Sequence, residues 1–109
     1  MGHNLGLFHS HSLDCGSAAV AASGCSASEY GDVFDLMGSN SGGHYNAAQK
    51  ERLGWLNDGA SPPLTTVAPV AGTATFDIAP LEDARNGAPR ALKIPRVTAC
   101  GVPTEWFYV

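Results

Sequence analysis

The sequence predicts an α+β fold, with helical segments in the first half of the chain and strands in the second. Residues 45–57 carry apolar side chains at helical spacing, and an Asn-Asp-Gly turn signal follows them. Residues 73–79, T-A-T-F-D-I-A, alternate apolar and polar side chains as a strand does. A chain of 109 residues, 44% of them hydrophobic, has the size of one domain and could bury about 60–68% of its unfolded surface.

The other elements are predicted from local patterns along the chain. Residues 1–8 are expected to form the last turns of a helix that packs through Leu5, Leu7 and Phe8. Residues 10–28 are rich in small side chains and predict a loop. Glycines at both ends of residues 29–43 indicate a turn segment. Further strands are expected at 64–70, 90–94 and 104–109, with a linker at 61–63 and a polar connection at 82–87.

Charge and hydropathy exclude two classes of partner. The chain has 6 Lys and Arg against 10 Asp and Glu, a net charge of -4, and no basic cluster that could bind phosphates. Nucleic acid is therefore not an expected partner. No apolar run approaches the ~20 residues that a membrane span needs, so no membrane association is expected either.

The first eleven residues, M-G-H-N-L-G-L-F-H-S-H, contain the main candidate site. His3 and His9 are six positions apart, and on a continuous helix they would point about 120° apart. Gly6 lies midway, and glycine can adopt a positive φ that ends a helix. The chain can then turn so that His9 approaches a metal ion held by His3. Because imidazole is a common zinc ligand, Zn²⁺ is the expected cofactor. His11 could add a ligand or a substrate contact, but a solvated loop histidine is the simpler interpretation.

Three segments resemble the metzincin zinc endopeptidases. The residues H-N-L-G-L-F-H look like the second half of the motif H-E-x-x-H-x-x-G-x-x-H. Glu29 to Gly38, E-Y-G-D-V-F-D-L-M-G, resembles the Met-turn that follows this motif. Tyr45 to Leu56, Y-N-A-A-Q-K-E-R-L-G-W-L, is similar to the next helix in the gametolysin-like branch of secreted proteases. The resemblance covers roughly residues 1–59.

This resemblance implies a site and an activity. His3 and His9 would be zinc ligands, Gly6 the helix-ending turn, and Met37 an apolar floor beneath the ligands. The first His and the general-base Glu of the motif would precede Met1, so an inactive fragment that binds zinc weakly is expected. The parent protein would be a secreted endopeptidase that cleaves extracellular or cell-wall proteins. Residues 1–59 would be the C-terminal half of its catalytic domain, and residues 60–109 the start of a truncated β-rich module.

The acidic residues and the cysteines have alternative interpretations. Glu29, Asp32 and Asp35 could be paired carboxylates for acid–base chemistry, or could hold the turn, which is the favoured interpretation. Cys15 and Cys25 could close a small loop as a disulfide or remain reduced, and Cys100 then has no partner.

A different class of function explains part of the sequence equally well. The strands expected between Leu64 and Val109 would suit a non-catalytic extracellular binding or structural module with incidental histidines. The sequence encoded before Met1 would discriminate between the two. A structural zinc site that uses Cys15 or Cys25 is disfavoured, because the chain has no closely spaced Cys-x-x-Cys pair.

Overall fold

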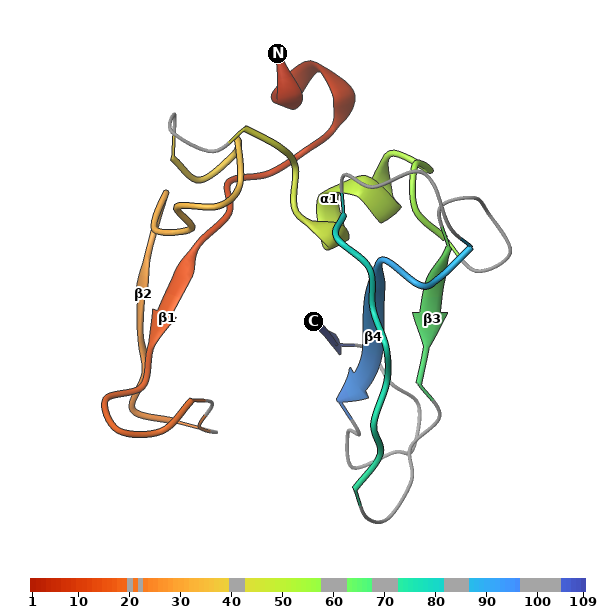
Figure 1. Ribbon diagram of the computed structural model, residues 1–109. Helices are drawn as coiled ribbons and strands as arrows, with labels where there is room; N and C mark the ends of the chain where they lie inside the picture. Colours follow the sequence, from red (N-terminus) through yellow and green to blue (C-terminus); the bar gives the residue numbers. More distant parts are fainter. Residues whose placement is uncertain are drawn as a thin grey trace. The chain divides into compact units, whose positions relative to one another are not determined.

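The computed structural model describes residues 1–19, 21, 23–39, 43–57, 63–67, 73–81, 87–96 and 105–109. It contains, in chain order, η1 (Gly2–Leu5), β1 (Ser12–Asp14), β2 (Ser26–Ser28), α1 (Ala47–Arg52), β3 (Leu64–Thr66), β4 (Ala91–Arg96) and β5 (Glu105–Tyr108) (Figure 1). Helix and strand are both present, as predicted, and strands predominate. The chain forms two compact units, Met1–Asn46 and Ala47–Val109. The division into domains at residues 59 and 60 stays a prediction.

The first unit begins with a short 3₁₀ helix and not with the expected end of a longer helix over residues 1–8. Helix η1 has four residues, and Gly6 follows it in the left-handed conformation, with φ 78° and ψ 17°. The N–H of Leu7 donates to the carbonyl of Gly2 at 3.1 Å, which closes the turn. Leu7 is 1% exposed, whereas Leu5 and Phe8 are 51% and 62% exposed, so only Leu7 packs as predicted. Short 3₁₀ turns are typical where an α-helix would be too short to nucleate alone.

A disulfide-closed hairpin replaces the loop expected at residues 10–28. Strands β1 and β2 pair antiparallel, with Ser12 opposite Ser28, and run side by side in Figure 1. Cys15 and Cys25, which directly adjoin the last residue pair of the hairpin, Asp14 and Ser26, form a disulfide with their Cα atoms 4.2 Å apart. The disulfide interpretation is therefore confirmed. The loop prediction is wrong at 12–14 and 26–28, whereas the described residues between these two strands have no regular structure, as predicted. Both strands are exposed at every position, so burial does not hold the hairpin together, and the cross-link takes on that role.

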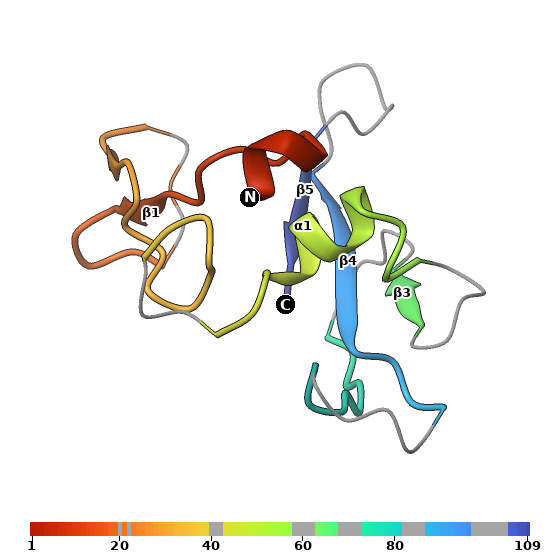
Figure 2. The same ribbon diagram turned by 90° about the horizontal axis from the view of Figure 1, so that it is seen from above.

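The second unit packs α1 against a three-stranded sheet of order β3-β4-β5. Strand β3 is parallel to β4 and β5 is antiparallel to it, and both ribbon views show α1 beside β4 (Figure 2). Glu51 of α1 pairs with Lys93 of β4 at 2.6 Å and accepts a hydrogen bond from the hydroxyl of Tyr108. Burial and this bond to Glu51 raise the pKa of Tyr108 above its ordinary value. The core consists of Leu56, Leu64 and Ala91, packed against Ala47, Leu81 and Tyr108.

Several predicted elements need correction. Helix α1 covers only 47–52 of the expected 45–57, because Gly54 turns the chain with φ 73°. The strand expected at 73–79 is absent, although Ala79 donates a backbone hydrogen bond to Pro89. Strand β3 confirms only the start of the 64–70 prediction, since residues 68–70 lie outside the described part. Strand β4, at 91–96, confirms a strand where 90–94 was predicted, and β5, at 105–108, confirms the described part of the strand predicted at 104–109. Residues 61–62 of the linker, 82–86 of the polar connection, and Cys100 also lie outside the described residues.

Within the described ranges, no helix has the length and hydrophobicity that a bilayer crossing requires.

Candidate metal centre

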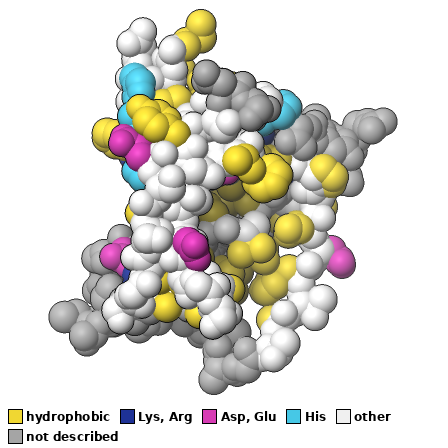
Figure 3. All heavy atoms as spheres, turned by 90° about the vertical axis from the view of Figure 1, so that its left-hand side faces the viewer, with side chains coloured by type: hydrophobic (Ala, Val, Ile, Leu, Met, Phe, Trp, Pro, Cys, Tyr) yellow, Lys and Arg dark blue, Asp and Glu magenta, His cyan; other side chains and the backbone are white. Residues whose placement is uncertain are grey.

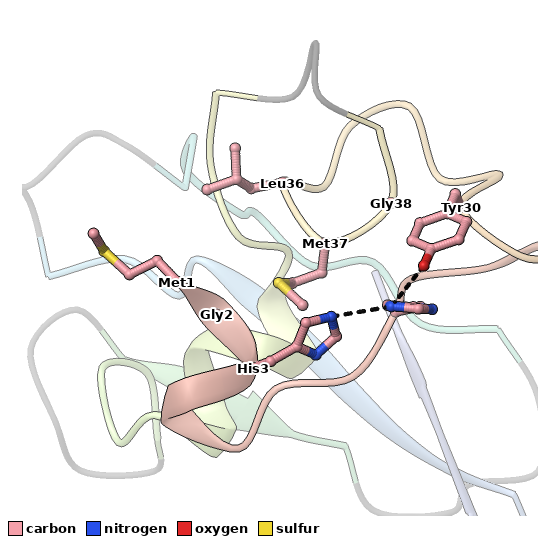
Figure 4. Close-up of a pocket in the computed structure, with 8 residues that line it drawn as sticks. Met1, Gly2, His3, Tyr30, Leu36, Met37 and Gly38 are labelled. Carbon is pink, nitrogen blue, oxygen red and sulfur yellow. Dashed lines mark hydrogen bonds between the residues drawn. The ribbon is translucent and has the colours of Figure 1, made fainter.

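The structure brings His3 and His9 together. Their Nε2 atoms lie 3.0 Å apart, and the two rings meet edge to face with centroids separated by 4.8 Å. Helix η1 carries His3, and the left-handed turn at Gly6 reverses the chain so that His9 returns to it. In Figure 4, a dashed line leads from the ring of His3 to its hydrogen-bond partner. The glycine turn therefore brings the two imidazoles together, as the six-residue spacing of His3 and His9 predicts.

The opposite nitrogen of each ring has an oxygen acceptor. Nδ1 of His3 lies 3.1 Å from the carbonyl oxygen of Leu7, and Nδ1 of His9 lies 2.5 Å from Oε1 of Glu29. A carbonyl and a carboxylate only accept hydrogen bonds, so Nδ1 carries the hydrogen in both rings. Each neutral ring then has its lone pair on Nε2. Two lone pairs that face one another at 3.0 Å repel, unless a proton or a metal cation lies between them.

The pair satisfies the requirements for two zinc ligands. Metal-binding histidines generally donate the hydrogen of the other ring nitrogen to a carboxylate or a backbone carbonyl, and both kinds of acceptor are present here. Zinc binds imidazole nitrogen at about 2.0–2.1 Å, so two ligands in a tetrahedral site are about 3.4 Å apart. The observed 3.0 Å is within a few tenths of an ångström of that separation. The two histidines therefore fit a zinc ion as part of its ligand set.

A third ligand is not provided by the described part of the chain. No group of three or more His, Cys, Asp or Glu side chains is placed there to hold a metal ion. His11 is exposed and does not line the cavity beside the histidine pair. This agrees with the solvated interpretation of His11. In Figure 3, histidine side chains are visible at the molecular surface next to acidic and hydrophobic side chains.

A cavity of about 170 Å³ adjoins the two histidines. Its lining consists of Met1, Gly2, His3, His9, Tyr30, Leu36, Met37 and Gly38. Met37 is 9% exposed, and its thioether lies beside His3 in Figure 4. A Cβ atom on Gly2 would collide with the Met37 sulfur, so glycine at this position lets η1 lie directly on the thioether. An apolar side chain thus forms one wall of the cavity, and the role of Met37 beneath a bound metal stays a prediction.

Asp35 organises the turn that carries Met37. This carboxylate is fully buried, and its Oδ1 and Oδ2 accept from the backbone N–H groups of Met37 at 2.5 Å and Asn46 at 2.6 Å. Its backbone carbonyl accepts from Gly38 and Ser39. Because both carboxylate oxygens are occupied by backbone donors, the structure favours a turn-holding role for Asp35 over acid–base chemistry. Asp32 likewise accepts from a backbone group, the N–H of Phe34 at 2.9 Å.

Glu29 and Tyr30 are site residues that the sequence did not indicate. Glu29 was expected to hold the turn or to pair with another carboxylate, but it contacts His9 instead. The hydroxyl of Tyr30 lies 2.9 Å from Nε2 of His9. The hairpin explains both contacts, because its register places the residues that precede β1 opposite those that follow β2. A correct hairpin prediction at 10–28 would have indicated both residues.

The turn at Gly6 should be sensitive to substitution. Gly6→Ala has room for the new Cβ but requires alanine at φ 78°, a left-handed conformation that costs roughly 1–2 kcal/mol. We expect a decrease of about that size in the free energy of unfolding, measured by urea denaturation, together with weaker zinc binding, because the Leu7 carbonyl that orients His3 follows this turn.

Gly87→Ala is the matched control, since Gly87 is also open to solvent but is not in the left-handed region. Equal effects of the two substitutions would contradict the role given to the turn.

Comparisons of the chain with protein-family models, with curated proteins and with solved structures found no match.

Proposed function

We propose that His3 and His9 are two zinc ligands of a metzincin-type endopeptidase of the gametolysin-like branch. The observation that carries this proposal is the approach of the two Nε2 atoms to 3.0 Å while both Nδ1 atoms are hydrogen-bonded. The order of the three resembling segments along the chain supports the same assignment. In this proposal, residues 1–59 represent the C-terminal half of the catalytic domain and residues 60–109 the beginning of a β-rich module.

Each residue of the site has a role in this proposal. The chemistry that zinc supplies when bound is polarisation of a peptide carbonyl and activation of a water molecule. His3 and His9 would bind the zinc ion, and the Leu7 carbonyl and Glu29 would orient their rings. The buried side chain of Met37 would exclude water from one side of the metal site. The motif places the remaining imidazole ligand and the general-base Glu four and three residues before His3, outside the printed sequence. The substrate would be a protein or a peptide.

The disulfide supports an extracellular location for this activity. Disulfides persist in oxidising compartments and are rare in the cytosol. The Cys15–Cys25 bond closes the hairpin whose open end holds His9 and Glu29, so the site depends on a bond that such compartments preserve. We therefore propose a secreted enzyme that acts on extracellular or cell-wall proteins.

A non-catalytic extracellular module is the alternative function. The observation that favours it is that only two histidines converge in the described part of the chain, with no third ligand among those residues. In that case the β-rich unit would carry the function, and removal of the histidines would leave it unchanged.

Zinc binding tests the proposal. We expect the purified chain to bind one zinc ion weakly, since two imidazoles make an incomplete site, and to show no peptidase activity by itself. His3→Ala and His9→Ala should each abolish binding in calorimetric titrations, because each removes one of two ligands. His11→Ala is the control and should bind as the wild type does.

Equal binding by all three variants would contradict the site. Peptide hydrolysis by this chain that His3→Ala abolishes would contradict the expectation that the general base is missing.

Glu29 should tune the affinity without being a ligand. Removal of a carboxylate that orients a metal-binding histidine typically costs about 10–100-fold in metal affinity. We expect Glu29→Gln to weaken zinc binding by about 10-fold, because the amide still accepts from Nδ1 but without the charge.

The control for this substitution is Glu105→Gln, which removes the same charge from a surface pair with Arg96 in the other unit. Equal losses of affinity in both variants would indicate a general charge effect and would rule out a specific role for Glu29.

A further inference from the structure

Asn46, the last residue of the first unit, contacts three separate segments around the candidate metal centre. Its backbone N–H donates to Oδ2 of Asp35 at 2.6 Å, and its side-chain Nδ2 lies 3.4 Å from Oγ of Ser10 and 3.3 Å from Oδ2 of Asp32. A carboxylate only accepts hydrogen bonds, so the nitrogen of the Asn46 amide, and not its oxygen, faces Asp32. One residue therefore joins the segments that contain Ser10, Asp32 and Asp35.

Two of these contacts lead to His9 and its hydrogen-bond acceptor. Ser10 directly follows His9, is 7% exposed, and its backbone carbonyl accepts from the N–H of Asp32 at 3.3 Å. Asp32 lies three residues after Glu29, so this backbone bond closes the open end of the hairpin next to the contact between His9 and Glu29. The Asn46 amide bridges the side chains of the same two residues, Ser10 and Asp32. It therefore holds together the two segments that carry His9 and Glu29.

The same network reaches Met37, which forms one wall of the cavity. The N–H of Ser10 donates to the carbonyl of Met37 at 3.1 Å, and Oδ1 of Asp35 accepts from the N–H of Met37 at 2.5 Å. Both backbone groups of Met37 are thus bonded to residues that contact Asn46. The wall of the cavity and the second histidine are connected through one side chain.

We propose that Asn46 is the positioning residue of the metal centre, which keeps Glu29 within reach of Nδ1 of His9 and so leaves Nε2 for the metal. This inference deepens the proposed zinc site and rests on it. A side-chain amide suits the role because its two N–H groups can serve two acceptors, the Ser10 hydroxyl oxygen and the Asp32 carboxylate. A carboxylate of the same shape cannot, since it has no hydrogen to donate to Asp32.

Asn46→Asp removes the donors and keeps the shape. The backbone N–H that Asp35 accepts stays, but the new carboxylate faces that of Asp32, and like charges repel. We expect zinc to bind about 10-fold more weakly, the lower end of what the loss of an outer hydrogen-bond partner costs a metal site. The added negative charge alone would act in the opposite direction, because it attracts the cation. The probe is zinc alone, titrated calorimetrically into the full chain.

A reciprocal double variant, Asp32→Asn with Asn46→Asp, restores the contact at the net charge of the wild type. An amide at position 32 can accept from the N–H of Phe34 through its oxygen, while its nitrogen donates to the carboxylate at position 46. The double variant should therefore recover most of the lost zinc affinity. Asn57→Asp, the same change at an exposed asparagine of the second unit, is the control and should bind zinc as the wild type does.

Nitrogen-15 NMR without zinc separates positioning from a general loss of structure. In the wild type, Nδ1 of both His3 and His9 should carry the hydrogen. In Asn46→Asp, His9 should become a mixture of its two tautomers, because Glu29 no longer fixes one of them. His3 should keep its hydrogen on Nδ1, because the Leu7 carbonyl that accepts it lies within the same turn.

Each outcome decides between the two levels of the proposal. Weaker zinc binding by Asn46→Asp, a tautomer change confined to His9 and recovery in the double variant together support the inference. Unchanged or tighter binding by Asn46→Asp overturns it and leaves the zinc site intact. Changes at both histidines, or no recovery in the double variant, also overturn it, because Asn46 would then act on the fold in general. If the wild type binds no zinc, both the proposed zinc site and the inference are overturned.

Discussion

The candidate metal centre depends on the hydrogen bonds that fix which nitrogen each imidazole presents. A histidine can bind a metal through either nitrogen, and an acceptor placed at one of them leaves the other for the metal. The Leu7 carbonyl does this for His3 and the Glu29 carboxylate does it for His9. The two acceptors come from different parts of the first unit. The Leu7 carbonyl follows the turn at Gly6, and Glu29 follows the second strand of the hairpin.

Irregular backbone carries this site, and specific polar contacts and one cross-link hold it in place. The strands of the hairpin are exposed, so the Cys15–Cys25 disulfide compensates for the apolar burial that is absent there. In the turn that follows, the buried carboxylate of Asp35 accepts backbone N–H groups that a helix or sheet would otherwise satisfy. A buried carboxylate is costly unless it is hydrogen-bonded in this way. The position of Met37 therefore depends on Asp35 as much as on its own packing.

Local features of the sequence predicted the histidine pair, and longer-range features were missed. His3 and His9 approach each other because they are six residues apart and Gly6 between them adopts the left-handed conformation. The conformational freedom of glycine is a local property that can be read from the sequence. The contacts of Glu29 and Tyr30 depend on the register of a hairpin that brings together residues 20 and 21 positions apart. The strands predicted near β4 and β5 form because these two segments pair with each other, whereas residues 73–79 show a similar alternation but have no ladder partner. Alternation indicates which side chains share a face, but it does not identify a neighbouring strand.

The most direct test of the central claim is nitrogen-15 NMR of the histidine side chains during a zinc titration. If His3 and His9 bind through the nitrogens that face one another, zinc should shift the Nε2 resonances of these two residues. Their Nδ1 atoms should keep their hydrogens, and the resonances of His11 and His44 should stay unchanged. Zinc-induced shifts at Nδ1, or shifts confined to His11 or His44, would contradict the account.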